Sequence, residues 1–286
     1  MLIPVDVPLD LYSTLYSGQA FRWRPDPGGD GWAEGVVFGN IVKMRWVSGK
    51  VEFRSSPDDV SVLEPLLRDY LRLHDDLDGI YGELGDDQHI HEGIAKYPGL
   101  RILRQEPWEN LIAFICSANN NIPRISANVE SMASSFGRPL SIDGAVRSTF
   151  PSPDVLAEAG EQKLRDLGLG FRAKWVSRAA TAVAEGRLDL YSLREAAYDE
   201  ALETLVSMDG VGDKIANCVL LFSMDKLEAF PVDVWIDRAL REWYLRGDDQ
   251  KMPRSRMRAW AQKRFGRYAG YANQYLFHGR RLQGKT

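Results

Sequence analysis

The stretch LETLVSMDGVGDKIANCVLLFS, Leu202–Ser223, predicts two helices joined by a tight glycine turn. Gly210 and Gly212 allow a backbone path that a Cβ would hinder, and they let another molecule approach the turn closely. We expect Asp213 to cap the second helix. Such a hairpin presents backbone N–H groups and the positive end of a helix, which suits a phosphate. On this stretch alone, an ordinary corner between two helices is an equally good interpretation.

Lys214 stands in the first turn of a helix whose following residues are apolar. The helix dipole and partial burial both disfavour the charged ammonium, and a neutral amine is a nucleophile that can form a Schiff base. Nineteen residues later, Asp233 follows Pro-Val and precedes an amphipathic helix, so it is a candidate N-cap and a candidate acid–base partner for the amine. A lysine that extends to solvent and an aspartate that only caps are the structural alternatives.

The composition is that of a soluble, globular protein of 286 residues, with 44% hydrophobic and 27% charged residues. Neither a membrane span nor a signal peptide is expected. The two cysteines, Cys116 and Cys218, are too few for a four-thiolate iron–sulfur or zinc site. The net charge is −4, yet residues 251–286 carry ten Lys and Arg and no acidic residue. This basic end indicates a face directed at a polyanion, with a solvated basic tail as the alternative.

The pattern of apolar residues divides the chain in two. Short aromatic and β-branched segments at 21–24, 31–39, 41–47 and 50–55 predict an antiparallel sheet, and a helical pattern begins near residue 57. From residue 105 onward, helices are expected at 106–118, 121–136, 153–168, 171–186, 193–208, 213–225, 234–245, 253–266 and 267–282. The predicted fold class is α+β, with a β/α domain at 1–104 and a helical domain at 105–286.

Gly-Val-Gly-x-Lys followed by Pro-Val-Asp resembles the helix-hairpin-helix (HhH-GPD) DNA glycosylase superfamily, in which the lysine marks members that also have lyase activity. Four further stretches narrow the resemblance to the 8-oxoguanine DNA glycosylase/AP lyase family, from about residue 10 to 280. They are SGQAFRWR (17–24), FICSANNNIPRI (114–125), LRDLGLGFRAKWV (164–176) and YAGYANQYLF (268–277). The family implies a twisted, TBP-like antiparallel N-terminal domain packed on a helical body, whose two subdomains flank an active-site cleft.

The resemblance implies a bifunctional enzyme that flips 8-oxoguanine out of double-stranded DNA and excises it, preferentially opposite cytosine. Lys214 would form a Schiff base with the sugar, Asp233 would assist it, and β-elimination would cut the strand. The expected protein is an intracellular, DNA-associated monomer without cofactor. The alternatives are a glycosylase of this superfamily for another lesion, such as adenine or formamidopyrimidine, and a non-catalytic helix-hairpin-helix module that only binds DNA.

The resemblance also implies a base pocket. Phe277 and Cys218 would lie on opposite faces of the flipped base. The Gly18 carbonyl would accept the N7 hydrogen, which 8-oxoguanine has and guanine lacks. Asn273 stands where the family has a base-reading Gln, so its neighbour Gln274 is a second candidate for the Watson–Crick edge.

Further residues are implied on the DNA side. Asn119, Arg124 and Arg172 would read the estranged cytosine, together with the adjacent Asn120, and Phe171 would wedge into the base stack. The remaining expectations concern the phosphate backbone: Gly210 and Gly212 in the hairpin, Trp235 in place of the family's usual histidine, and a monovalent cation on the main-chain carbonyls near Val206, Met208 and Val211. No metal is required by the expected chemistry.

Overall fold

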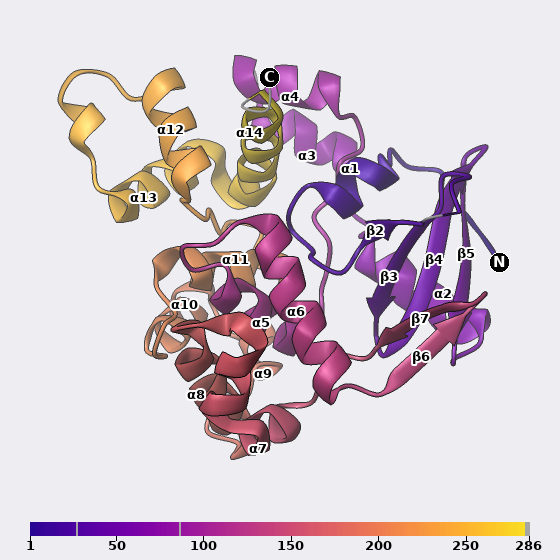
Figure 1. Ribbon diagram of the computed structural model, residues 1–286. Helices are drawn as coiled ribbons and strands as arrows, with labels where there is room; N and C mark the ends of the chain where they lie inside the picture. The colour runs from indigo at the N-terminus through magenta and orange to yellow at the C-terminus, as the bar shows by residue number, and fades with distance from the viewer. Residues whose placement is uncertain (27, 86, 284–286) are drawn as a thin grey trace.

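The computed structural model describes residues 1–26, 28–85 and 87–283. Its N-terminal part is an antiparallel sheet, and the rest is a helical body (Figure 1). The sheet order is β1-β5-β4-β3-β2. The strands are β1 (Leu2–Pro4), β2 (Arg24–Pro25), β3 (Ala33–Val37), β4 (Asn40–Val47) and β5 (Lys50–Ser56). The expected α+β fold class is confirmed.

The sheet is covered on one face by α1 (Leu11–Tyr16) and α2 (Val60–Tyr70). In the register, Met44 of β4 lies opposite Phe53 of β5, and both side chains are fully buried. They join the leucines of the two helices in a separate small core, because alternate strand residues point to the same face.

Two expectations about strands need correction. Of the predicted strand 21–24, only Arg24 lies in a strand, β2, and Phe21 and Trp23 instead point into two different hydrophobic cores. A hairpin of β6 (Pro139–Ile142) and β7 (Ala145–Ser148) lies within the part expected to be almost entirely helical. Its turn is Asp143-Gly144, both with positive φ, which is the favoured chemistry of a two-residue hairpin turn.

The helical body surrounds two nearly buried helices, α5 (Pro107–Cys116) and α11 (Asp213–Ser223). The other elements are α3 (Leu77–Leu84), α4 (Gln88–Lys96), α6 (Ile122–Phe136), α7 (Pro153–Leu164), a π-helical turn (Arg165–Leu169), α8 (Arg172–Ala184), α9 (Ser192–Glu195), α10 (Tyr198–Val206), α12 (Val234–Trp243), α13 (Arg254–Phe265) and α14 (Ala269–Gln283). The C-terminal helix α14 packs beside α4, so the end of the chain contacts a helix from its first hundred residues (Figure 1). Within the described residues, no helix is long and apolar enough to cross a membrane.

Candidate active site

The glycine hairpin joins α10 to α11 as expected, but its cap differs from the prediction. Gly212 is the N-cap of α11, while Asp213 is the first helical residue. The Asp213 carboxylate instead forms an ion pair with Arg258 of α13 at 3.0 Å. Within the turn, the Val211 N–H donates to the Met208 carbonyl at 3.1 Å. The turn is therefore held by its own backbone and by a side chain from the basic C-terminal region.

The two hairpin glycines have different structural requirements. Gly210 has φ +81°, and a Cβ there would lie 2.2 Å from the ring of Trp175. Gly212 has φ −89°, is exposed, and a Cβ there would meet nothing within 4 Å. Gly210 therefore fixes the packing of the hairpin on α8, whereas Gly212 leaves open space at the surface.

This difference gives a matched pair of variants. We expect Gly210→Ala to lower the free energy of unfolding by about 2–5 kcal/mol, because backbone strain and steric overlap add. Gly212→Ala should cost less than about 1 kcal/mol, the usual scale of an N-cap change. Denaturant unfolding followed by circular dichroism measures both. Equal losses in the two variants would contradict the packing assigned to Gly210.

Lys214 is half-buried and its amine has a defined position. Its Nζ donates to Ser117 Oγ at 3.0 Å, and the Ser117 hydroxyl donates to the Phe114 carbonyl at 2.6 Å. The amine also lies 5.1 Å from the centre of the Phe114 ring. Because the hydroxyl proton is committed to that carbonyl, Ser117 accepts from the amine and orients it. The spacing of residues in the sequence does not predict this contact, because Ser117 lies at the end of α5, 97 residues before Lys214.

The cavity beside Lys214 measures ≈ 710 Å³, which lies within the range of about 300–1,000 Å³ typical of small-molecule sites. We call it the catalytic cavity. Its walls include Gly18, Asn119, Asn120, Gly212, Lys214, Cys218, Asp233, Trp235, Asn273, Gln274 and Phe277. The structure thus brings together both candidate catalytic residues and every candidate base-pocket residue. Arg124, Phe171, Arg172 and Gly210 lie outside these walls.

Asp233 caps α12 as expected, since its Oδ1 accepts from the Ile236 N–H at 2.9 Å. Burial raises the pKa of Asp233, and the bond from Ile236 and the charge of nearby Lys214 offset part of that rise. The carboxylate is therefore anchored by the backbone at the start of α12. A carboxyl that is anchored, desolvated and close to an amine is suited to proton transfer and to stabilising positive charge.

Two walls of the catalytic cavity suit a planar base. Cys218 is 4% exposed, and burial raises the pKa of its thiol to about 11, so it offers a neutral, apolar surface. Gly18 has φ +89°, and a Cβ there would lie 2.9 Å from Ile122 and 3.2 Å from Phe277. Glycine is therefore required where the main chain meets the ring of Phe277.

The adjacent side chains of Asn273 and Gln274 have different hydrogen-bonding environments. The Asn273 side chain donates to the Pro231 carbonyl at 2.9 Å, and so holds the segment that leads to Asp233. Gln274 is 2% exposed, and its Nε2 has no hydrogen-bond partner among the described residues. Since a buried amide without a partner is costly, Gln274 is the amide better prepared to bind a ligand.

The three consecutive asparagines also have separate positions. Asn119 is exposed with φ +47°. Asn120 donates to the Cys116 carbonyl at 2.9 Å, and Asn121 caps α6 by accepting from the Arg124 N–H at 3.0 Å. The Arg124 side chain is exposed beside them. The triplet is thus partly a helix cap and partly an open polar surface.

Phe171 and Arg172 differ sharply in exposure. Phe171 is 46% exposed, with its ring edge-on to Trp175 at 5.2 Å. Arg172 is 3% exposed, and its guanidinium donates to the carbonyls of Ala118 and Asn119 at 2.5 to 2.8 Å. In this structure Arg172 supports the asparagine loop, and its predicted contact with the estranged cytosine stays a prediction.

Comparison with known proteins identifies the family of this chain. The model for the 8-oxoguanine DNA glycosylase N-terminal domain matches residues 2–111, and that for the HhH-GPD superfamily of base excision DNA repair proteins matches residues 112–263. An N-glycosylase/DNA lyase of Saccharomyces cerevisiae is 32% identical, covering 94% of this chain and 82% of the relative. An N-glycosylase/DNA lyase of Arabidopsis thaliana is 33% identical, and the match covers 94% of this chain and 76% of the relative.

Solved structures extend the agreement to three dimensions. The Clostridium acetobutylicum 8-oxoguanine glycosylase/lyase, in complex with double-stranded DNA containing cytosine opposite 8-oxoguanine, matches with a TM-score of 0.91 at 29% identity, covering 99% of this chain and 98% of that one. A 3-methyladenine DNA glycosylase of Archaeoglobus fulgidus, at 19% identity and a TM-score of 0.81, shares the fold. The chain belongs to the 8-oxoguanine DNA glycosylase family of the helix-hairpin-helix (HhH-GPD) superfamily.

Proposed function

We propose that Lys214 and Asp233 are the catalytic pair of this 8-oxoguanine DNA glycosylase and AP lyase. The observation that carries the proposal is that both residues line the catalytic cavity, with the amine oriented by Ser117 and the carboxyl anchored by its cap bond. The neutral amine attacks C1′ and the bond to the base breaks. The attacking nitrogen loses a proton to Asp233, the displaced base takes up a proton, and the sugar ring opens to a Schiff base. β-Elimination then removes a proton from C2′ and breaks the bond between C3′ and its phosphate oxygen, so that the phosphate leaves with the cut strand.

Recognition of the lesion follows from the cavity walls. The Gly18 carbonyl accepts the N7 hydrogen of 8-oxoguanine, whereas guanine would place a lone pair against it. Phe277 and Cys218 contact the two faces of the base. Gln274, with its unpartnered amide, reads the Watson–Crick edge in place of the shorter Asn273.

The test of substrate class is a panel of duplexes that carry 8-oxoguanine, formamidopyrimidine, 3-methyladenine or adenine opposite 8-oxoguanine. We expect 8-oxoguanine opposite cytosine to be released fastest. Faster release of another base would replace the proposed substrate. Tight binding of lesion DNA with no release from any duplex would instead support a binding module without catalysis.

Arg124 provides a separate test of opposite-base preference. Its exposed guanidinium can bond two atoms of a base edge beside Asn119, and each such pair contributes roughly 1–3 kcal/mol of discrimination. We therefore expect Arg124→Ala to reduce the preference for cytosine opposite the lesion by about tenfold or more. Single-turnover excision against the four opposite bases measures it, with Arg187→Ala, just beyond α8, as an exposed control. An unchanged order of the four bases would contradict the assignment.

The remaining parts of the proposal concern the assembly on DNA. Phe171 wedges into the base stack, the hairpin with Gly210 and Gly212 holds the phosphate backbone, and Trp235 takes the place of a phosphate-binding histidine. The protein acts inside the cell as a monomer on double-stranded DNA, without a cofactor. The proposed domain boundary near residue 104 leaves α3 and α4 in the first domain, although they pack on the core of the helical body. A monovalent cation held by the Val206, Met208 and Val211 carbonyls would strengthen the phosphate contact.

A further inference from the structure

A second cavity of ≈ 480 Å³ lies between the sheet domain and the start of α5. Its walls come from residues 20–23, the end of β3 and the following turn, residues 105–113 and residues 149–155. The two cavities share Phe21 as a wall residue. None of the catalytic groups described above lies on the walls of the second cavity, so it is a distinct space.

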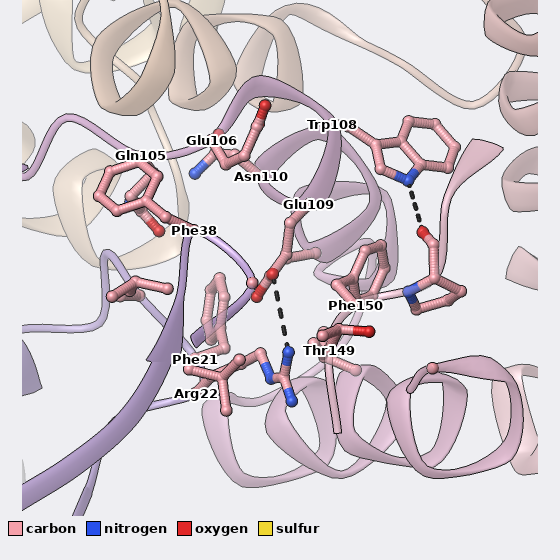
Figure 2. Close-up of a pocket in the computed structure, with 18 of the residues that line it drawn as sticks. Phe21, Arg22, Phe38, Gln105, Glu106, Trp108, Glu109, Asn110, Thr149 and Phe150 are labelled. Atoms are coloured by element: carbon pink, nitrogen blue, oxygen red, sulfur yellow. Dashed lines mark hydrogen bonds and ion pairs between the residues drawn. The ribbon is translucent and has the colours of Figure 1, made fainter. Parts of the chain in front are cut away.

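Glu109 is one of four charged residues that line the second cavity, together with Arg22, Glu106 and Arg138. Its side chain is 25% exposed, and among the described residues its carboxyl accepts no hydrogen bond. The nearest cationic atom is Arg22 Nη1 at 3.7 Å, which is an ion pair too long to be a hydrogen bond. Figure 2 shows the Glu109 carboxyl pointing toward Arg22 among the side chains that line the cavity. Arg22 bonds Glu130 at 2.7 Å through Nε and the Ser148 carbonyl at 2.5 Å through Nη2. Its Nη1, which faces Glu109, is buried without a hydrogen-bond partner among the described residues.

Asn110 gives a second, independent sign of an unfilled site. It is 3% exposed and lines the second cavity next to Glu109 (Figure 2). Both polar atoms of its amide are buried without a hydrogen-bond partner in the described part of the chain. Buried amides in folded proteins are nearly always bonded, so a polar ligand or ordered water completes this wall.

Aromatic rings form much of the remaining wall. Phe21, Phe38, Trp108 and Phe150 all line the second cavity, and Figure 2 shows Phe21 and Phe150 near the Glu109 carboxyl. The indole N–H of Trp108 is occupied by the Pro151 carbonyl at 2.9 Å. These rings therefore offer π-faces and apolar surface and no additional donor.

The Glu109 carboxyl and the aromatic wall together indicate the chemical class of the ligand. A carboxyl without hydrogen bonds is best satisfied by two parallel N–H donors, and aromatic faces favour a cation with a flat apolar body. We propose that the second cavity binds a small organic cation with a planar amidinium or guanidinium head, which bonds Glu109 and stacks against the aromatic wall. The bound cation supplies the hydrogen bonds that the Glu109 carboxyl lacks.

The surroundings of Glu109 predict how the affinity for this cation changes with pH. Burial raises the pKa of Glu109 to about 7, with Glu130 and Glu106 adding to the rise and Arg22 and Arg147 opposing it. A cationic ligand needs the ionised carboxylate. Its affinity should therefore increase from pH 6 to pH 8, by about tenfold for a carboxyl that titrates near 7.

The test is calorimetric titration of the full chain with benzamidine, which stays cationic over this pH range. We expect binding at pH 8, about tenfold weaker binding at pH 6, and at least tenfold weaker binding of the neutral isostere benzamide. Glu109→Gln should weaken benzamidine binding at least tenfold, whereas Asp233→Asn, in the catalytic cavity, should leave it unchanged. Equal binding by wild type and Glu109→Gln, or no binding by the wild type at millimolar benzamidine, would overturn the proposal.

A second variant covers the case in which Glu109→Gln does not fold. Val155 is 37% exposed and lines the second cavity, so Val155→Trp adds bulk at its surface without disturbing the core. We expect this variant to weaken benzamidine binding while it excises 8-oxoguanine at the wild-type rate. Undiminished binding by a folded Val155→Trp would place the ligand elsewhere.

Discussion

Lys214→Gln is expected to form no covalent adduct with DNA containing 8-oxoguanine under borohydride, and to excise the base at least about 10³-fold more slowly than the wild type. Removing a nucleophile costs more than removing a group that only assists it. Glutamine keeps most of the length of lysine and can still donate to Ser117, so the cavity wall remains. Single-turnover excision and borohydride trapping measure the two losses.

The control for Lys214→Gln is Lys163→Gln, an exposed lysine on α7 that is remote from both cavities. It should trap and excise as the wild type does. The Lys214→Gln protein should still bind lesion DNA in a mobility-shift assay, because the proposed base and phosphate contacts are made by other residues. If Lys214→Gln gave an adduct, or excised at more than a tenth of the wild-type rate, the nucleophile would have to be another residue.

The sequence was most informative where a few local residues carry the chemistry. The hairpin, Lys214 and the Asp233 cap were predictable, because each depends on neighbours within one or two turns of the chain. Trp175 beneath Gly210 and Ser117 beside Lys214 were not predictable. Both are contacts between segments far apart in the chain, and periodicity does not reveal which segments meet.

Neighbouring polar residues were the hardest to assign. Asn273 and Gln274 carry adjacent amides on one helix, and only their hydrogen bonds show that their roles differ. Asn273 donates to the Pro231 carbonyl, whereas the Gln274 Nε2 has no partner among the described residues. The resemblance implied that Arg172 reads the estranged cytosine, and the structure shows its guanidinium bonded to the carbonyls of Ala118 and Asn119. Local pattern indicates that a polar side chain is present, whereas tertiary packing decides whether its donors are already occupied.

Asp233→Asn is expected to lower the rate of excision by about 10²–10⁴-fold, the usual contribution of a positioned acid–base group. Asparagine is as good an N-cap as aspartate, so the bond from the Ile236 N–H remains and only the proton acceptor is lost. The acid limb of the wild-type pH–rate profile reports the raised pKa of Asp233, and this limb should be absent from the residual activity of the variant.

Stability separates this catalytic role from the structural one. Because burial raises the pKa of Asp233, the folded state binds its proton more readily than the unfolded chain does. The contribution of this group to stability therefore falls as the pH rises from its unfolded pKa through its folded pKa, and it stays unfavourable at neutral pH. Asp233→Asn removes that cost and should be at least as stable as the wild type at pH 7.

The comparison variant is Asp233→Ala, which loses the cap as well and should be less stable than Asp233→Asn by about 1 kcal/mol. Denaturant unfolding at pH 7 measures both variants beside the excision assay. An Asp233→Asn protein that is inactive because it is unstable would show that the carboxylate mainly supports the fold. An inactive Asp233→Asn protein with full stability places the carboxylate in the reaction, because the cap bond and the packing of α12 are then intact while proton transfer is lost.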